Sequence, residues 1–174
     1  MDNDAHELSP LDEESQAAIG VIAALCRESV TETDLEKLVL EIDRQLVNTG
    51  FNFVSMTVNR LLDEETQLFS AHVITASTEY KHVVNRRTGV FREWKSGKVI
   101  YRSNLDKDLD GLPIESIEKR SRNFGITVKS TVNVPFSRGM LVLRSIDPEA
   151  FTEIQIDFLQ RIARELSLAP ICQA

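Results

Sequence analysis

The stretch from Thr127 to Ser145, TVKSTVNVPFSRGMLVLRS, decides the fold. Its apolar or β-branched residues include Val128, Val132, Val134, Leu141 and Leu143, and polar residues lie between many of them. This is the period-two pattern of strands with two different faces. Ser137-Arg138-Gly139 predicts a turn, with Gly139 free to adopt a positive φ. Pro135 donates no hydrogen bond to a neighbouring strand, so we expect it at a strand end or a sheet edge. The stretch therefore predicts the central antiparallel hairpin of a sheet.

Length and charge restrict the class of protein. A chain of 174 residues is expected to form one domain and to bury roughly 70% of its unfolded surface. The net charge of −7 argues against a nucleic-acid surface and against docking on an acidic membrane. No apolar run approaches the ~20 residues of a membrane span, and the acidic, polar N-terminus is no signal peptide. Cys26 and Cys172 lie near opposite ends of the chain and form no disulfide or zinc pattern. We therefore expect a cytoplasmic protein without nucleic-acid or membrane partners.

Helices are predicted near both ends of the chain. Residues 1–8 are expected to be a disordered tail, and residues 9–30 a dimerisation helix with Ser9 as its cap. The apolar arc of this helix has two adjacent stripes, which is wider than one contact surface needs. Residues 31–170 are expected to be the main domain, and residues 171–174 a second tail.

The elements between the ends follow from capping and turn signals. A capping box at Thr33 and Glu36 predicts a helix that ends at Gly50. Strands are predicted over Phe51–Leu61, Gln67–Thr75 and Lys98–Arg102, and a short helix over Pro113–Asn123. A second capping box, Thr152 with Gln155, predicts the last helix. Its apolar stripe comprises Ile154, Phe158, Leu159, Ile162, Ala163 and Leu166.

No catalytic or metal-binding constellation emerges from the residue spacing. His72 and His82 have no cysteine nearby and match no metal signature, so a structural or exposed role is the preferred interpretation. Asp106, Asp108 and Asp110 lack the downstream Gly and the twelfth-position Glu of a calcium loop, which indicates a solvated loop. We therefore predict no catalytic residue, no metal and no cofactor.

A candidate pocket follows from the alternation along the strands. If Val54, Met56 and Val58 pack on helices, their neighbours on the first strand face the other way, as do the neighbours of Val132 and Val134 in the hairpin. Val128 is assigned to the helix side as well. The candidate ligand-binding residues are Phe53, Ser55, Thr57, Trp94, Tyr101, Arg102, Thr131 and Asn133.

Three of these residues come from the middle of the chain and leave alternatives open. Trp94, Tyr101 and Arg102 are placed to close the pocket from above, but Trp94 and Tyr101 could equally fill a minor core. Arg102, if it points inward, needs an anion or carboxylate partner. A register error of one residue would exchange the two faces.

A second hypothesis concerns the terminal helices. Their apolar residues could form a bundle with a second copy of the chain, or they could simply cover their own sheet. The candidate dimer-interface residues are Ile19, Ile22, Leu159, Ile162 and Leu166.

The chain resembles the GAF family of small-molecule sensor domains over roughly residues 33–169. The resemblance is carried by WKSGKVIY from Trp94, by the loop with Asp106 and Asp108, by STVNVPF from Ser130, and by GMLVL from Gly139. It continues through DPEAFT from Asp147 and the terminal helix. The resemblance implies an α+β fold, GAF- or PAS-like, with a central antiparallel sheet of about six strands. It places the N- and C-terminal helices on one face and a variable loop and helix segment, with a ligand pocket beneath, on the other.

The resemblance also implies a function. We expect a non-enzymatic regulatory domain that binds a small molecule or dimerises, and so controls an output. The output is expected beyond Ala174 or in trans, as a kinase, a cyclase or a transcription regulator. The alternatives are a ligand-free structural dimerisation module and, more weakly, a free methionine sulfoxide reductase-like enzyme. Cys26 on the first helix and Cys172 in the tail depart from the reductase and bilin-binding patterns, and the Asn-Lys-Phe-Asp-Glu set of cyclic-nucleotide-binding members is not evident.

Overall fold

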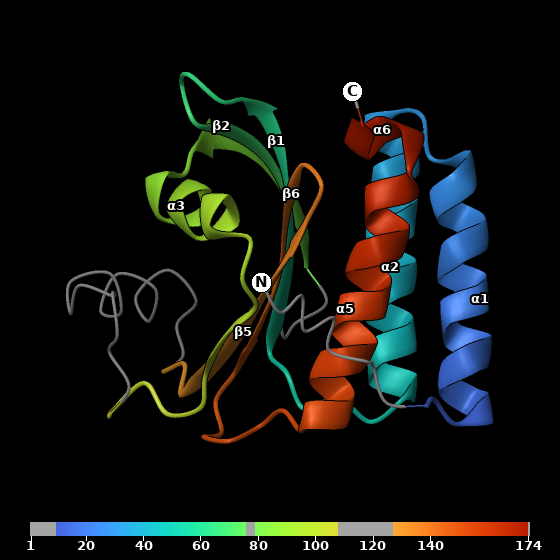
Figure 1. The fold of residues 1–174 in the computed structure, drawn as a ribbon, viewed down its shortest axis with the longest axis vertical. Helices are drawn as coiled ribbons and strands as arrows, with labels where there is room; N and C mark the ends of the chain where they lie inside the picture. Colours follow the sequence, from blue (N-terminus) through green and yellow to red (C-terminus); the bar gives the residue numbers. More distant parts are fainter. Residues whose placement is uncertain (1–9, 76–78, 108–126, 174) are drawn as a thin grey trace, which may run out of the picture.

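The fold is a six-stranded antiparallel sheet with helices on both faces. The structure, a computed structural model, describes residues 10–75, 79–107 and 127–173. The strands follow the order β3-β2-β1-β6-β5-β4. Figure 1 shows α1, α2 and α5 on one side of the sheet and α3 on the other. The elements in chain order are α1 (Glu13–Glu28), α2 (Glu32–Asn48), β1 (Ser55–Asp63), β2 (Leu68–Thr75), β3 (Tyr80–Arg86), α3 (Thr88–Ser96), β4 (Ile100–Arg102), β5 (Ser130–Phe136), β6 (Gly139–Ser145), α5 (Glu153–Leu168) and α6 (Pro170–Gln173).

The predicted α+β class is confirmed. No helix in the described ranges is long and apolar enough to cross a membrane. The helix predicted over Pro113–Asn123 and the tail predicted over residues 1–8 lie outside the described residues, as do Ser9, Asp108 and Asp110.

The β5–β6 hairpin has the predicted place, but its glycine serves another purpose. Pairing runs from Ser130↔Ser145 to Phe136↔Gly139, so Ser137 and Arg138 make the turn. Among the described glycines, positive φ angles occur at Gly50 and Gly97 and not at Gly139. A Cβ atom at Gly139 would instead collide with the carbonyl oxygen of Asn59 and the ring of Phe136. Gly139 is therefore required by the close approach of β1 and not by the turn.

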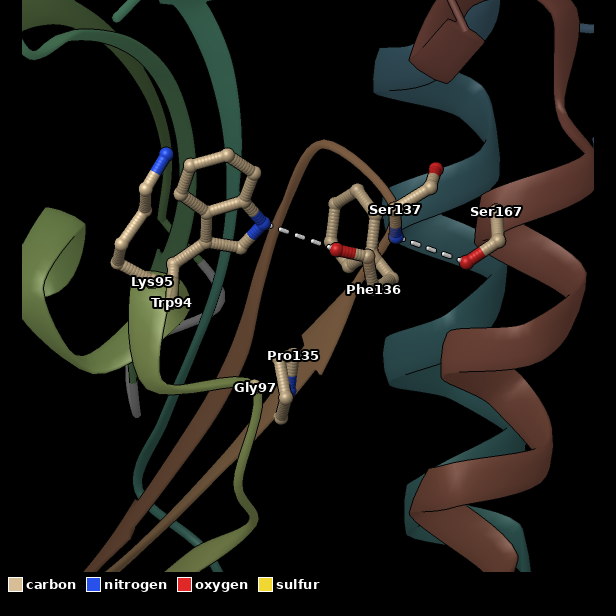
Figure 2. Close-up of a pocket in the computed structure, with 7 residues that line it drawn as sticks. All are labelled: Trp94, Lys95, Gly97, Pro135, Phe136, Ser137 and Ser167. Carbon is tan, nitrogen blue, oxygen red and sulfur yellow. Dashed lines mark hydrogen bonds between the residues drawn. The ribbon is translucent and has the colours of Figure 1, made fainter.

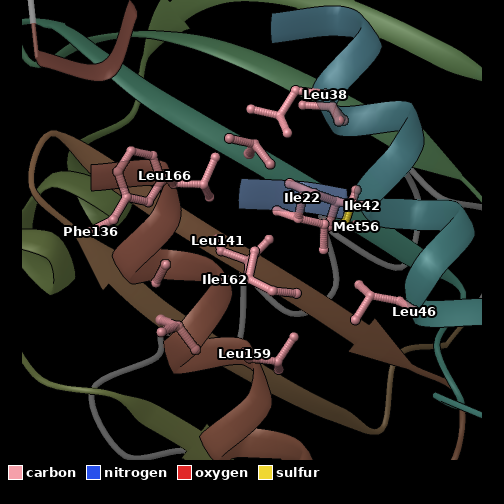
Figure 3. Close-up of a cluster of buried hydrophobic side chains, with 14 of the residues drawn as sticks. Ile22, Leu38, Ile42, Leu46, Met56, Phe136, Leu141, Leu159, Ile162 and Leu166 are labelled. Carbon is pink, nitrogen blue, oxygen red and sulfur yellow. The ribbon is translucent and has the colours of Figure 1, made fainter. Parts of the chain in front are cut away.

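One face of the sheet and the helices α1, α2, α5 and α6 share the main hydrophobic core. Met56, Val58, Val132 and Val134 point into it, as the alternation predicted. Val128 does not, because it precedes β5 and packs with Leu105 in a separate small cluster. Figure 3 shows how the α2 and α5 side chains meet the sheet in this core, among them Leu38, Ile42, Leu46, Leu159, Ile162 and Leu166.

Two helices begin at other capping residues than the sequence predicted. Asp12 caps α1 by accepting a hydrogen bond from the Ser15 N–H. The capping box of α2 is Thr31 with Asp34 instead of Thr33 with Glu36, because Asp34 reaches back to the Thr31 N–H at 2.9 Å. The predicted box of Thr152 with Gln155 is confirmed.

The terminal helices cover their own chain. α1 packs on α2 and α5, which accounts for its second apolar stripe. Ile22, Leu159, Ile162 and Leu166 are fully buried in the core of the single chain, so these candidate interface residues are not accessible to a partner. Ile19 packs against the same core and is only partly buried. Ile154, expected in the buried stripe of α5, is instead 62% exposed because it lies on the outer face of the first turn.

The C-terminal residues form a short helix instead of the expected tail. α6 is attached to the end of α1 by a hydrogen bond of 3.0 Å from the Ile171 N–H to the Ser29 carbonyl. Cys172 in α6 is fully buried.

Two elements of the middle segment escaped prediction. β3 is an edge strand in which only Tyr80 is partly buried, so it shows no alternation. α3 begins at Thr88, and its N-cap residue Arg87 makes no side-chain cap hydrogen bond, so the usual signal for a helix start is absent.

Candidate functional site

Four polar residues form one row across the face of the sheet opposite the main core. Ser55 of β1 lies opposite Arg144 of β6, Arg144 lies opposite Thr131 of β5, and Thr131 lies opposite Arg102 of β4. Residues directly opposite on antiparallel strands share a face. All four are buried. Four neighbouring strands therefore each contribute a buried polar side chain to this face of the sheet, and two of these side chains are cationic.

Glu93 of α3 connects this row to α3, through Arg102 and through Asn133, which lies next to the row on the same face. Asn133 of β5 donates from Nδ2 to Oε2 of Glu93 on α3. Arg102 donates from Nη2 to Oε1 of the same carboxylate at 2.9 Å. Glu93 is therefore the carboxylate partner that an inward-pointing Arg102 requires, and it holds α3 over β4 and β5.

Arg144 is oriented by hydroxyl groups of β1. Its Nη1 lies 3.0 Å from Thr57 Oγ1 and 3.4 Å from Ser55 Oγ. Arginine stays protonated in proteins, so Arg144 contributes a positive charge to the row.

Three buried oxygens of this face have no hydrogen-bond partner among the described residues: Thr131 Oγ1, Asn133 Oδ1 and Asn59 Oδ1. The orientation of the Asn133 amide is determined by Glu93, because a carboxylate accepts only from the NH₂ side. The Nδ2 of Asn59 likewise donates to the Met140 carbonyl. A buried acceptor without a donor costs about 1–3 kcal/mol, so these oxygens are the natural attachment points for N–H or O–H groups.

The structure brings most of the predicted pocket residues together. Ser55, Thr57, Arg102, Thr131 and Asn133 lie on this one face. We call these five residues, with Glu93 and Arg144, the polar cluster.

Phe53 and Tyr101 lie on the helix side of the sheet instead. Tyr101 is opposite Val132 in the β4–β5 register, and its hydroxyl accepts a hydrogen bond of 3.3 Å from the Phe151 N–H. Phe53 precedes β1, so strand alternation does not govern its direction, and it packs against the main core. Both predictions of a pocket-facing side chain are therefore wrong.

Trp94 lines a different feature, an open hollow of about 560 Å³ where the β5–β6 turn meets α5. Figure 2 shows its indole Nε1 donating to the Phe136 carbonyl, at 3.0 Å, and the Ser137 N–H donating to Ser167 Oγ, at 2.9 Å. Because the polar atom of Trp94 is satisfied within the chain, this residue connects α3 to the end of the hairpin. It lies outside the polar cluster.

Glu93 and Arg144 were missed by the sequence analysis. Arg144 has the same parity as Met140 and Val142 and alternates with Leu141 and Leu143, so strand alternation alone could have placed it. Glu93 could be placed only once α3 was known, and α3 has no capping signal.

The two cysteines lie on the helix side and are inert thiols. Both are free and buried. Burial, and to a lesser extent the nearby thiol of Cys172, raises the pKa of Cys26 to about 12. Burial raises the pKa of Cys172 to about 11. Neither is a thiolate at neutral pH, which is the form that reacts.

Potential metal ligands meet at one place in the described part of the chain, where Glu32, His72 and His82 converge on the helix side. They come from α2, β2 and β3, so no short sequence spacing could have revealed them.

Several solved structures have a similar fold, although no protein-family model and no curated protein sequence matches the chain. The GAF domain of an Acinetobacter phosphoenolpyruvate-protein phosphotransferase aligns with a TM-score of 0.61 at 17% identity, over 90% of this chain and 92% of that one. The free methionine-R-sulfoxide reductase of Neisseria meningitidis aligns with a TM-score of 0.57 at 16% identity, over 95% of both chains. The PixJ GAF domain of Thermosynechococcus elongatus, in its blue-light-absorbing form, aligns with a TM-score of 0.56 at 16% identity, over 94% and 90%. The chain therefore has the GAF-domain fold.

Proposed function

We propose that the chain is a regulatory GAF-type sensor domain that binds a small polar molecule at the polar cluster. The observation that carries the proposal is the buried row of Ser55, Arg144, Thr131 and Arg102. Burying such a row costs free energy unless its groups find partners. Small-molecule sites use a few convergent polar groups of this kind on a covered surface.

The atoms of the cluster indicate the chemistry of the ligand. Thr131 Oγ1 and Asn133 Oδ1 are placed to accept from N–H or O–H groups. Arg144 flanks Thr131 on the neighbouring strand, and a guanidinium group can also bind a carboxylate or a phosphate group. The ligand class is therefore a small molecule that combines hydrogen-bond donors with an anionic group.

We propose that the domain is not an enzyme. A sulfoxide reductase-like alternative would need a reactive thiol near the polar cluster. Cys26 and Cys172 lie on the opposite side of the sheet, and burial raises the pKa of both well above neutral. Free buried thiols also agree with a reducing cytoplasm.

A thermal-shift screen tests the binding proposal. The protein is melted with a panel of amino acids, nucleotides, cyclic nucleotides and sugar phosphates. We expect at least one compound with both donor and anionic groups to raise the Tm of the wild type and of Ser167→Ala, whose change lies in the open hollow. The same compound should fail to shift Thr131→Val, which keeps the shape of the side chain and removes only the hydroxyl. A compound that shifts all three proteins equally would place binding elsewhere.

We propose in addition that the domain forms a homodimer through the outer surfaces of its helices and passes its state to an output module. Leu40 and Val47 are exposed and seven residues apart on α2, so they share a face, and Val21 is exposed on α1. Sedimentation equilibrium tests this, with Leu40→Arg expected to shift a dimer towards monomer. A monomer at high concentration would remove the proposal. The output is a kinase, a cyclase or a transcription regulator, joined to the chain or acting in trans.

A further inference from the structure

The N-terminus of α2 meets the β2–β3 edge of the sheet in a group of polar side chains far from the polar cluster. His72 of β2 and His82 of β3 are direct cross-strand partners. Their rings are stacked, with centroids 4.5 Å apart and planes 19° apart. His72 lies opposite Val58, a residue of the main core, so both rings are on the helix side. The side chain of Glu32, the first residue of α2, extends to both rings.

The donor atoms of these residues converge on one point. Glu32 Oε2 lies 3.0 Å from His72 Nε2 and 4.0 Å from His82 Nε2. All three ligand atoms lie within 4.8 Å of one another. Ligands about 2.0–2.1 Å from a tetrahedral zinc ion are about 3.3 Å apart, so a small movement of His82 would complete the spacing.

Neighbouring groups supply a fourth ligand and an orienting bond. Ser70 Oγ lies 2.8 Å from His82 Nε2 and 3.2 Å from Glu32 Oε2, where it or a water completes a tetrahedron. The Nδ1 of His72 is hydrogen-bonded to the Tyr80 hydroxyl at 2.7 Å. Such a bond to the outer nitrogen directs the Nε2 lone pair of a histidine towards a metal.

Access also suits a metal. His82 and Glu32 are partly exposed, with 36% and 40% of their side chains accessible, so an ion can enter from solvent.

Two features oppose a cation here. Arg60 forms an ion pair with Glu32, and the N-terminus of α2 carries partial positive charge. The ion pair uses Oε1 of Glu32, however, and leaves Oε2 directed at the histidines. Without an ion, the same atoms form a hydrogen-bond network, in which Ser70 Oγ donates to Glu32 Oε2 and Nε2 of both histidines lies within hydrogen-bond distance of Ser70 Oγ or Glu32 Oε2.

We propose that Glu32, His72 and His82 form a binding site for a divalent transition-metal ion, with Zn²⁺ as the ion best suited to two imidazoles and one carboxylate. Bound there, the ion links the start of α2 to β2 and β3, which are already paired with each other in the sheet. It fastens the start of α2 to the exposed edge strand β3.

Calorimetric titration with Zn²⁺ tests the proposal on the full chain after removal of metals with EDTA. We expect 1:1 binding that is at least tenfold weaker in Glu32→Gln and in His82→Ala, and tighter in Arg60→Met. His82 is partly exposed, so its substitution leaves the core intact, and circular dichroism in EDTA checks the fold of each variant. Titration with Co²⁺ adds the visible absorption of a tetrahedral site with nitrogen and oxygen ligands.

The controls remove the other candidate ligands in the chain. His6→Asn changes the remaining histidine, and Cys26→Ser with Cys172→Ser removes both thiols. We expect both control proteins to bind as the wild type does. Wild-type affinity in Glu32→Gln and His82→Ala, loss of binding in either control, or no stoichiometric binding at all would each overturn the site.

Discussion

The buried ion pair of Glu93 and Arg102 gives a quantitative test of the polar cluster. Glu93→Gln keeps the shape of the side chain and removes its charge, which leaves the guanidinium of Arg102 facing a neutral amide. Both side chains are more than nine-tenths buried, and removal of one partner of such a pair costs about 3–5 kcal/mol. The Gln amide retains one oxygen as an acceptor, so we expect a loss of about 3 kcal/mol in the free energy of unfolding.

The matched control is the exposed ion pair of Glu64 and Lys95, whose atoms lie 3.1 Å apart. Pairs of this kind contribute about 0–1 kcal/mol, so Glu64→Gln should leave stability nearly unchanged. Urea denaturation at pH 7 measures both variants against the wild type. Equal effects of Glu93→Gln and Glu64→Gln would refute the argument that α3 is held on the sheet by a buried charge.

Three further predictions concern other parts of the chain. Burial lowers the folded pKa of His72 from 6.5 to about 4, so the stability that neutral His72 contributes is present above pH 6.5 and is lost as the pH falls towards 4. Between pH 7 and pH 5 we therefore expect the free energy of unfolding of His72→Asn to fall by about 1–2 kcal/mol less than that of the wild type. Parallel curves of stability against pH would contradict this. Gly139→Ala should cost more than about 2 kcal/mol in urea denaturation, because the added methyl group meets the Asn59 carbonyl; a loss below half of that would show that β1 yields easily. Thr152→Ala should lower the stability by about 1 kcal/mol through loss of the α5 cap, which a shift of Tm detects, whereas Thr152→Ser should retain most of it.

The sequence was sufficient for features that rest on strict alternation or on a strong cap. Val132 and Val134 face the helices and Thr131 and Asn133 face away, because the period of two leaves no other arrangement once one face is buried. Thr152 with Gln155 likewise identified the start of α5.

The sequence was insufficient where contacts come from distant elements or where local signals are weak. Tyr101 was assigned to the wrong face because β4 has only three residues, too few to show a period. Glu93 and the histidine site depend on the packing of α3 and α2 against strands far away in sequence, and no local pattern records that packing. The same limit applies to the terminal helices. Ile22 and Leu159 are apolar, and the sequence does not distinguish an apolar residue that packs in its own core from one that contacts a partner.

The binding of a small molecule at the polar cluster is tested most directly by native mass spectrometry. The protein is purified gently, equilibrated with the compound panel, and compared with Thr131→Val under native and denaturing conditions. The account predicts a non-covalent adduct on the wild type that disappears on denaturation and is absent from Thr131→Val. The mass of the bare chain in every spectrum, or an adduct that Thr131→Val retains in full, would contradict it.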